Sequence, residues 1–194
     1  MPKCASDKGA VADSLWRYLK HEMSYHFDRL KILVVDDNQH MRSLVSAVLE
    51  AFGVKTVFEA QNAEDAWEIM TLHRCDIIFC DWVMTGMTGL EFAKRIRCAS
   101  DSPNPFVPII MLTGHTSIER VNAARDAGVN EFLAKPVSSK AILSRLIAVI
   151  EHPRPFVRTK VYFGPCRRRR KEGADGPERR ASALDSRDTP PNAA

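Results

Sequence analysis

Between residues 30 and 152 the chain alternates short apolar runs with segments whose apolar residues recur at helical spacing. The short runs are rich in Val, Ile, Leu and Phe, which is typical of strands buried on both faces of a parallel sheet. The expected strands cover 31–35, 54–60, 75–81, 107–112 and 131–134. Helical patterns follow them at 41–49, 63–70, 90–97, 117–126 and 139–150.

Strict alternation of strand and helix predicts an α/β fold, because each crossover helix returns the chain to add one parallel strand. We expect a doubly wound, flavodoxin-like sheet of five strands with five helices in residues 30–152. Residues 1–29 are expected to form a weakly ordered N-terminal extension, and residues 153–194 a basic tail that is mostly disordered. Met23 lies shortly before the first strand, and we hypothesise that translation begins there.

Composition is consistent with one domain plus extensions. The chain has 194 residues, 45% of them hydrophobic, which is enough for one core. No apolar run reaches the roughly 20 residues of a membrane span, and residues 1–29 are too charged for a secretory signal, so we expect a cytoplasmic protein. None of the five cysteines forms a C-x-x-C pair, and we interpret Cys75, Cys80 and Cys98 as buried reduced thiols.

Polar residues of particular types follow four of the expected strands. Asp36 and Asp37 follow the first strand, Asp81 ends the third, Thr113 follows the fourth and Lys135 follows the fifth. The carboxyl ends of parallel strands share one edge of the sheet, where open α/β folds bind their ligands. Three close carboxylates repel one another unless a hard divalent cation lies among them, and Mg²⁺ would leave one carboxylate free to act as a nucleophile.

These residues resemble the receiver domain of two-component response regulators, of the CheY-like, single-domain type. Each matching motif is short and therefore weak alone, but together they occur in the expected order at the expected strand ends over residues 30–152. The motifs are Val34-Val35-Asp36-Asp37-Asn38, Asp81-Trp82, Gly89-Leu90, Leu112-Thr113-Gly114, Ala127-Gly128 and Lys135-Pro136.

The resemblance implies a role for each site residue. Asp81 would be the phosphoacceptor, receiving a phosphoryl group from a phosphohistidine on a histidine kinase or histidine phosphotransfer protein. Asp36, Asp37 and Asp81 would bind Mg²⁺ together with the backbone carbonyl of Val83. Lys135 would pair with a phosphoryl oxygen as charge develops in the transition state.

The resemblance also implies a switch. Thr113 would hydrogen-bond the phosphoryl group, and the Phe132 ring would rotate into the space that Thr113 vacates. A downstream protein would then bind the surface of the fourth helix, fifth strand and fifth helix. The family further implies a cis bond between Lys135 and Pro136.

The loop after Asp81 departs from the family pattern. Thr85 stands where the family usually has Pro, and Thr88 where it usually has Asp, so we expect a looser loop without loss of a ligand. Val83 and His115 occupy positions that often tune the attack of water on the acyl phosphate. Apolar Val83 does not position water, and we therefore expect a long-lived phosphoryl state.

Three other interpretations of the strand ends are less consistent with these residues. Asp36 and Asp37 as mere helix caps would leave Thr113 and Lys135 unexplained. A receiver that is never phosphorylated would be expected to lack the acceptor, the acidic pair or the lysine. An Asp-nucleophile phosphohydrolase is disfavoured because such enzymes typically carry a second Asp where this chain has Val83. We therefore do not expect an enzyme.

The tail carries the positive charge of the chain. Residues 151–194 hold 11 Lys and Arg against 6 Asp and Glu, whereas residues 30–150 hold 12 against 14. Residues 156–163 alternate apolar with basic side chains, and five consecutive cations follow at 167–171. Four interpretations stay open: a solvated tail, docking of 157–163 on the receiver or a partner, binding to nucleic acid, and attraction to an anionic membrane.

Overall fold

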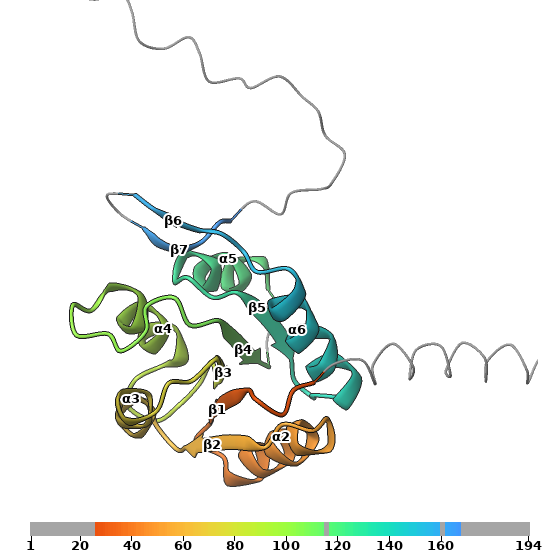
Figure 1. Cartoon of the computed structure of the whole chain (residues 1–194). Helices are drawn as coiled ribbons and strands as arrows, with labels where there is room; N and C mark the ends of the chain where they lie inside the picture. Colours follow the sequence, from red (N-terminus) through yellow and green to blue (C-terminus); the bar gives the residue numbers. More distant parts are fainter. Residues whose placement is uncertain (1–25, 115–116, 160–161, 168–194) are drawn as a thin grey trace, which may run out of the picture.

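The central sheet has five parallel strands in the order β2-β1-β3-β4-β5 (Figure 1). This computed structural model describes residues 26–114, 117–159 and 162–167. The strand order confirms the doubly wound fold predicted from the alternating pattern. The strands are β1 (Lys31–Val35), β2 (Thr56–Ala60), β3 (Ile77–Asp81), β4 (Ile109–Thr113) and β5 (Glu131–Ala134).

Helices cover both faces of the sheet and form two separate cores. Residues of α3, α4 and α5 pack against one face, and residues of α2 and α6 pack against the other. The labels begin at α2, so α5 and α6 are the fourth and fifth helices predicted above. The helices are α2 (Gln39–Ala51), α3 (Ala63–Leu72), α4 (Gly89–Cys98), α5 (Ile118–Asp126) and α6 (Ser139–Glu151).

The apolar runs form the strands because the middle of the sheet is closed to water on both faces. All five residues of β3 and all five of β4 are buried, as expected for central parallel strands. Cys75 and Cys80 are buried as predicted, but the prediction for Cys98 was wrong, because its side chain is exposed at the end of α4. Its neighbour Arg97 takes the inward position instead.

Each helix begins at a polar side chain that accepts a hydrogen bond from the first turn. Asn38 and Asn62 cap α2 and α3, Thr88 caps α4, and Ser117 and Ser138 cap α5 and α6. These caps satisfy backbone N–H groups that have no partner within the helix. They set the points at which the loops at the carboxyl edge of the sheet end.

After α6 the chain forms an antiparallel hairpin of β6 (Phe156–Arg158) and β7 (Phe163–Pro165). β7 contacts α4, and Arg167, which follows β7, lies 3.1 Å from Asp126 at the end of α5 (Figure 1). The Phe106 ring, in the loop before β4, contacts Phe156 and Phe163 edge-on, with ring centroids 5.2 Å apart in both pairs. Of the four interpretations of the tail, docking on the receiver domain agrees with these contacts of Phe156 and Phe163.

A buried arginine anchors the region beneath the hairpin. Arg97, at the end of α4, donates hydrogen bonds to the carbonyls of Gly128 and Pro105 and to Asn130 Oδ1, at 3.0, 2.8 and 3.1 Å. These acceptors precede β4 and β5, so this is the amino edge of the sheet. Arg154 joins the hairpin to the same edge through the carbonyls of Asn130 and Cys166.

Several predictions fall on residues that the structure does not describe. The N-terminal extension up to residue 25 and the hypothesis about Met23 lie outside the described residues, as does residue 168 onward of the tail (153–194) that was predicted to be mostly disordered. The described part of that tail contains the hairpin of β6 and β7, which the prediction did not include. Phe27 is described, and it is buried in the core with α2 and α6. Within the described residues, no helix is long and apolar enough to cross a membrane.

Candidate functional site

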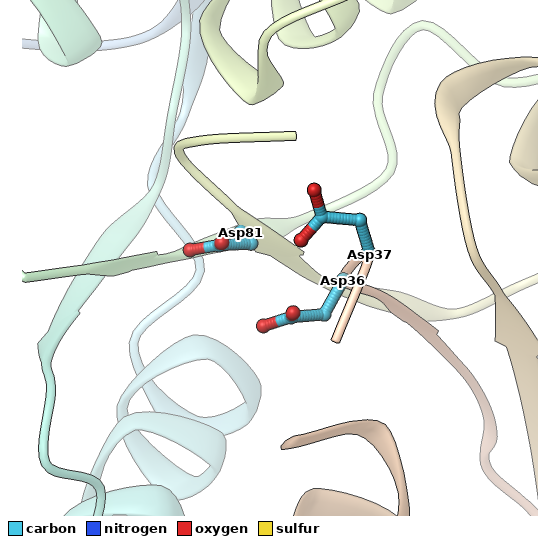
Figure 2. Close-up of side chains that lie close together, drawn as sticks. All are labelled: Asp36, Asp37 and Asp81. Carbon is cyan, nitrogen blue, oxygen red and sulfur yellow. The ribbon is translucent and has the colours of Figure 1, made fainter. Parts of the chain in front are cut away.

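Three carboxylates meet at the carboxyl edge of the sheet (Figure 2). Asp36 and Asp37 directly follow β1, and Asp81 is the last residue of β3. The two strands are neighbours in register, so the residues that end them lie side by side. Ligand oxygens of the three carboxylates lie within 4.8 Å of one another.

Two of these carboxylates are buried and held by backbone donors. Asp36 is fully buried, and Asp81 is 6% exposed. The backbone N–H of Asn38 donates to Asp36 Oδ1 at 2.9 Å, and that of Trp82 donates to Asp81 Oδ1 at 2.8 Å. These bonds fix both side chains at the sheet edge.

Lys135 brings a cation between the two buried acids. Its Nζ lies 2.9 Å from Asp36 Oδ2 and 2.9 Å from Asp81 Oδ1. Burial alone would lower the pKa of Lys135, but its hydrogen bonds to Asp81 and Asp36 outweigh that effect and raise the pKa above its usual value. The ammonium is therefore charged at neutral pH. The Lys135–Pro136 bond is cis, which confirms that prediction.

The two oxygens of the Asp81 carboxylate have different contacts. Both hydrogen bonds that its carboxylate accepts from the described residues fall on Oδ1. Burial raises the pKa of the Asp81 carboxyl above its usual value, and the hydrogen bond from Lys135 opposes that shift. Neither of these two contacts involves the second oxygen, Oδ2.

The donor set fits a hard divalent cation. Asp36, Asp37 and Asp81 supply three carboxylates, and Lys135 balances only one of their charges. Carboxylate oxygens are the ligands that Mg²⁺ prefers, and a site with excess negative charge favours a cation. The residues present therefore fit the predicted metal.

Two other predicted site residues lie on adjoining strands. Thr113 ends β4 and is buried, and Phe132 on β5 is partly buried against the α3–α5 core. In the register, Thr113 pairs with Ala134 and Phe132 pairs with Met111, so all four side chains point to the same face of the sheet. The structure thus brings Thr113 and Phe132 together on one face.

The remaining predicted positions are less informative. The side chain of Val83 is 63% exposed, two residues after Asp81. His115 lies outside the described residues. The structure therefore does not test the predicted effect of these positions on the phosphoryl lifetime.

The sequence profile of the response regulator receiver domain matches residues 32–147. The chain belongs to this family. Its members are signalling domains of two-component systems, and this chain has a CheY-like phosphoacceptor domain. The family prediction made from the strand-end residues is confirmed.

Chemotaxis proteins are among the similar proteins. Chemotaxis protein CheY1 of Helicobacter pylori is 34% identical over 122 residues, covering 62% of this chain and 97% of that protein. The solved structure of CheY4 of Vibrio cholerae is 35% identical with a TM-score of 0.58, covering 62% of this chain and 98% of that one. The phosphate regulon transcriptional regulatory protein PhoB of Pseudomonas aeruginosa is 31% identical over 124 residues, 53% of its length.

The β3–α4 loop of this receiver domain shows why its two departures are tolerated. Thr88 caps α4 in a capping box: its hydroxyl accepts from the Glu91 N–H at 3.3 Å, and its own N–H donates to Glu91 Oε2 at 2.9 Å. Thr85 donates twice to Asp37 Oδ2, from its N–H at 3.1 Å and its hydroxyl at 2.9 Å. The expectation of a looser loop overlooked both sets of hydrogen bonds.

Gly89 marks the closest approach of α4 to the phosphoacceptor strand. Its N–H donates to the Trp82 carbonyl at 3.0 Å. A Cβ added at this position would collide with the backbone carbonyl oxygen of Asp81. Any other residue would push α4 away from β3, which explains the glycine in physical terms.

Proposed function

We propose that this chain is a response regulator that accepts a phosphoryl group on Asp81 and signals through changed protein contacts. The observation that carries the proposal is the position of Lys135 Nζ, 2.9 Å from both Asp36 and Asp81 beside a third carboxylate. A buried nucleophile, a cation and a cluster of oxygen ligands together suit phosphoryl transfer.

In the proposed reaction, Asp81 Oδ2 attacks the phosphorus of a phosphohistidine on a histidine kinase or histidine phosphotransfer protein. The new O–P bond forms as the N–P bond breaks, and the electron pair returns to the imidazole nitrogen, which takes up a proton. Lys135, held beside Asp81, moves to pair with a phosphoryl oxygen and neutralises its charge. The product is an aspartyl phosphate.

Mg²⁺ would be held by Asp36, Asp37 and Asp81 with the backbone carbonyl of Val83. When bound, the metal supplies positive charge that offsets the repulsion between the carboxylates and the phosphoryl oxygens. The three clustered carboxylates support this assignment. Lys135 supplies the other positive charge at the site.

The phosphoryl group would act through Thr113 and Phe132. Thr113 would move toward the new acceptor oxygens, and Phe132 would turn inward behind it. Their shared face supports this coupling. The output surface would consist of α5, β5 and α6, where a downstream protein binds, and the predicted cytoplasmic location belongs to the same proposal.

The proposal is tested by incubating the purified chain with acetyl phosphate and separating the products on a phosphate-affinity gel. With Mg²⁺, the wild type is expected to give a retarded band that Asp81→Asn lacks. Chelation of the metal is expected to abolish the wild-type band. Equal labelling of wild type and Asp81→Asn would contradict the proposal, because the phosphoryl group would then lie elsewhere.

The second candidate function is a phosphorylation-controlled adaptor whose basic tail binds nucleic acid or an anionic membrane. The charge of the tail favours it. The three described cations of the tail already have contacts within the chain. Arg154 binds backbone carbonyls, Arg158 lies over the Phe163 ring at 4.8 Å, and Arg167 lies 3.1 Å from Asp126. The candidate therefore depends on residues 168–171, which lie outside the described residues. A steep loss of binding with added salt would support it.

A further inference from the structure

Asp37 differs from the other two acids of the site in having an exposed side chain. Asp36 and Asp81 are buried and each is fixed by a backbone N–H and by Lys135. The terminal torsion of an aspartate is broad, so an exposed carboxylate can turn through many orientations. Something else must hold Asp37 if the three ligands are to stay together.

Thr85 meets that requirement from the opposite loop. Its hydroxyl and its N–H both donate to the same oxygen, Asp37 Oδ2, at 2.9 and 3.1 Å. The two residues are 48 positions apart, so the contact ties the end of β1 to the loop after β3. A proline at this position would have neither donor.

The double contact determines which oxygen faces the site. With Oδ2 engaged by Thr85, Oδ1 accepts no hydrogen bond from the described residues and is left for a cation. Hydrogen bonds from outside the ligand set commonly orient metal-binding carboxylates in this way. We propose that Thr85 is a positioning residue, which orients the Asp37 carboxylate and thereby strengthens Mg²⁺ binding.

This inference rests on the proposed Mg²⁺ site. An opposite effect of Thr85 is also physically reasonable, since two donors draw charge from the carboxylate and would weaken its bond to a metal. The sign of the effect on Mg²⁺ affinity therefore decides between orientation and competition. Substitutions that remove one or both donors measure that sign.

The experiment is a calorimetric titration of the full-length chain with Mg²⁺ alone. Thr85→Val removes the hydroxyl and keeps the shape, Thr85→Ser keeps the hydroxyl, and Thr85→Pro removes both donors. We expect the Kd for Mg²⁺ to rise about fivefold in Thr85→Val and further in Thr85→Pro, and to stay within about twofold in Thr85→Ser. Thr71→Val is the matched control, because the Thr71 hydroxyl bonds only its own helix, at the Trp67 carbonyl, and its Kd should not change.

A Kd in Thr85→Val that equals or falls below the wild-type value would overturn the positioning role while leaving the metal site intact. Failure of the wild type to bind Mg²⁺ would overturn the proposed metal site and the positioning role together. The Mg²⁺ concentration that gives half-maximal phosphorylation by acetyl phosphate adds a second readout. It is expected to rise in Thr85→Val by the same factor as the Kd, whereas a loss of rate that added Mg²⁺ does not restore would contradict a role limited to orienting a metal ligand.

Discussion

Two cations, the partly buried Lys135 and the buried Arg97, lie at opposite edges of the same sheet, and they are bonded to different kinds of partner. At the carboxyl edge, Lys135 contacts the carboxylates of Asp36 and Asp81. At the amino edge, all three hydrogen bonds of Arg97 go to neutral oxygens. Lys135 is therefore bound mainly by opposite charges, and Arg97 by well-placed hydrogen-bond acceptors.

The difference distinguishes the acidic cluster around Lys135, which has unbalanced charge, from the contacts of Arg97, in which the side chain has all its hydrogen-bond partners within the chain. The planar guanidinium of Arg97 reaches three fixed acceptors at once, and burial lowers its pKa to about 9, so it remains charged at neutral pH. The Phe156 ring lies over it at 5.1 Å. By contrast, Lys135 leaves two negative charges unbalanced at its edge. That edge is where we propose that a metal and a phosphoryl group bind.

One helix connects the two edges. α4 begins at the carboxyl edge with the Thr88–Glu91 capping box and ends at the amino edge with Arg97. Gly89 lets its first turn lie against the Asp81 backbone. If the comparison is correct, damage at the amino edge should lower stability without changing metal binding, and neutralising the acids should do the reverse.

The largest effect is expected from Arg97→Met. It removes the donor to the carbonyls of Gly128 and Pro105 and one of the two donors to Asn130 Oδ1, which keeps the N–H of Ile109. We expect the free energy of unfolding to fall by about 3 kcal/mol. For a chain of this size, that corresponds to a loss of roughly 6–12 °C in Tm. Lys94→Met, an exposed cation on the same helix, is the control for thermal unfolding. A Tm change equal to that of the control would show that the hydrogen bonds of Arg97 do not stabilise the fold.

Deletion of residues 153–194 should have the next largest effect. It removes the contacts of Phe156 and Phe163 with the Phe106 ring. We expect the free energy of unfolding, measured with a denaturant, to fall by about 2 kcal/mol. Deletion of residues 168–194 alone keeps the hairpin and should change stability by less than about 0.5 kcal/mol. If the shorter deletion cost as much as the longer one, the hairpin would not be the source of the stability.

Asp37→Asn should act in the opposite direction. In metal-free buffer it relieves repulsion among three clustered carboxylates, and we expect the free energy of unfolding to rise by about 1 kcal/mol. Added Mg²⁺ should raise the Tm of the wild type and of Arg97→Met, because the two edges are independent, but not that of Asp37→Asn. A matching Mg²⁺ response in Asp37→Asn would count against the metal site.

The smallest effect concerns pH at the start of α4. The hydrogen bond from the Thr88 N–H lowers the pKa of Glu91 below its ordinary value. The contribution of Glu91 to stability is therefore fully present above that ordinary value and is lost as the pH falls through the lowered pKa. Glu91→Ala should therefore melt slightly below wild type at neutral pH and converge with it in acid. A difference in Tm that persisted unchanged in acid would exclude the ionised capping box.

The carboxyl edge could be predicted from the sequence, and the amino edge could not. Parallel strands align their ends, so Asp36, Asp81 and Lys135 are brought together by topology alone. The sequence pattern indicates a solvent-exposed cation at Arg97, in the last turn of a helix, where the helix dipole favours a positive charge. Its burial depends on carbonyls of distant loops and on a hairpin that follows the last helix.

The contact of Thr85 with Asp37 was not predicted from the sequence for a related reason. As a departure from the family pattern, Thr85 indicated only the loss of a rigid proline. The contact with Asp37 depends on how the loop after β3 turns toward β1. Neither the motif at the end of β1 nor the Asp81-Trp82 motif predicts that turn. A hydroxyl residue in a loop facing an exposed acid across the sheet edge was the available signal.

The central claim is that Asp81 carries the phosphoryl group, and the most direct measurement identifies the modified residue. The chain is treated with acetyl phosphate and Mg²⁺, and borohydride then reduces the acyl phosphate to an alcohol with release of phosphate. Peptide mass spectrometry should find homoserine in place of Asp81 in the wild type, and unmodified peptide in a chelated control. Homoserine at Asp36 or Asp37, with Asp81 intact, would contradict the account.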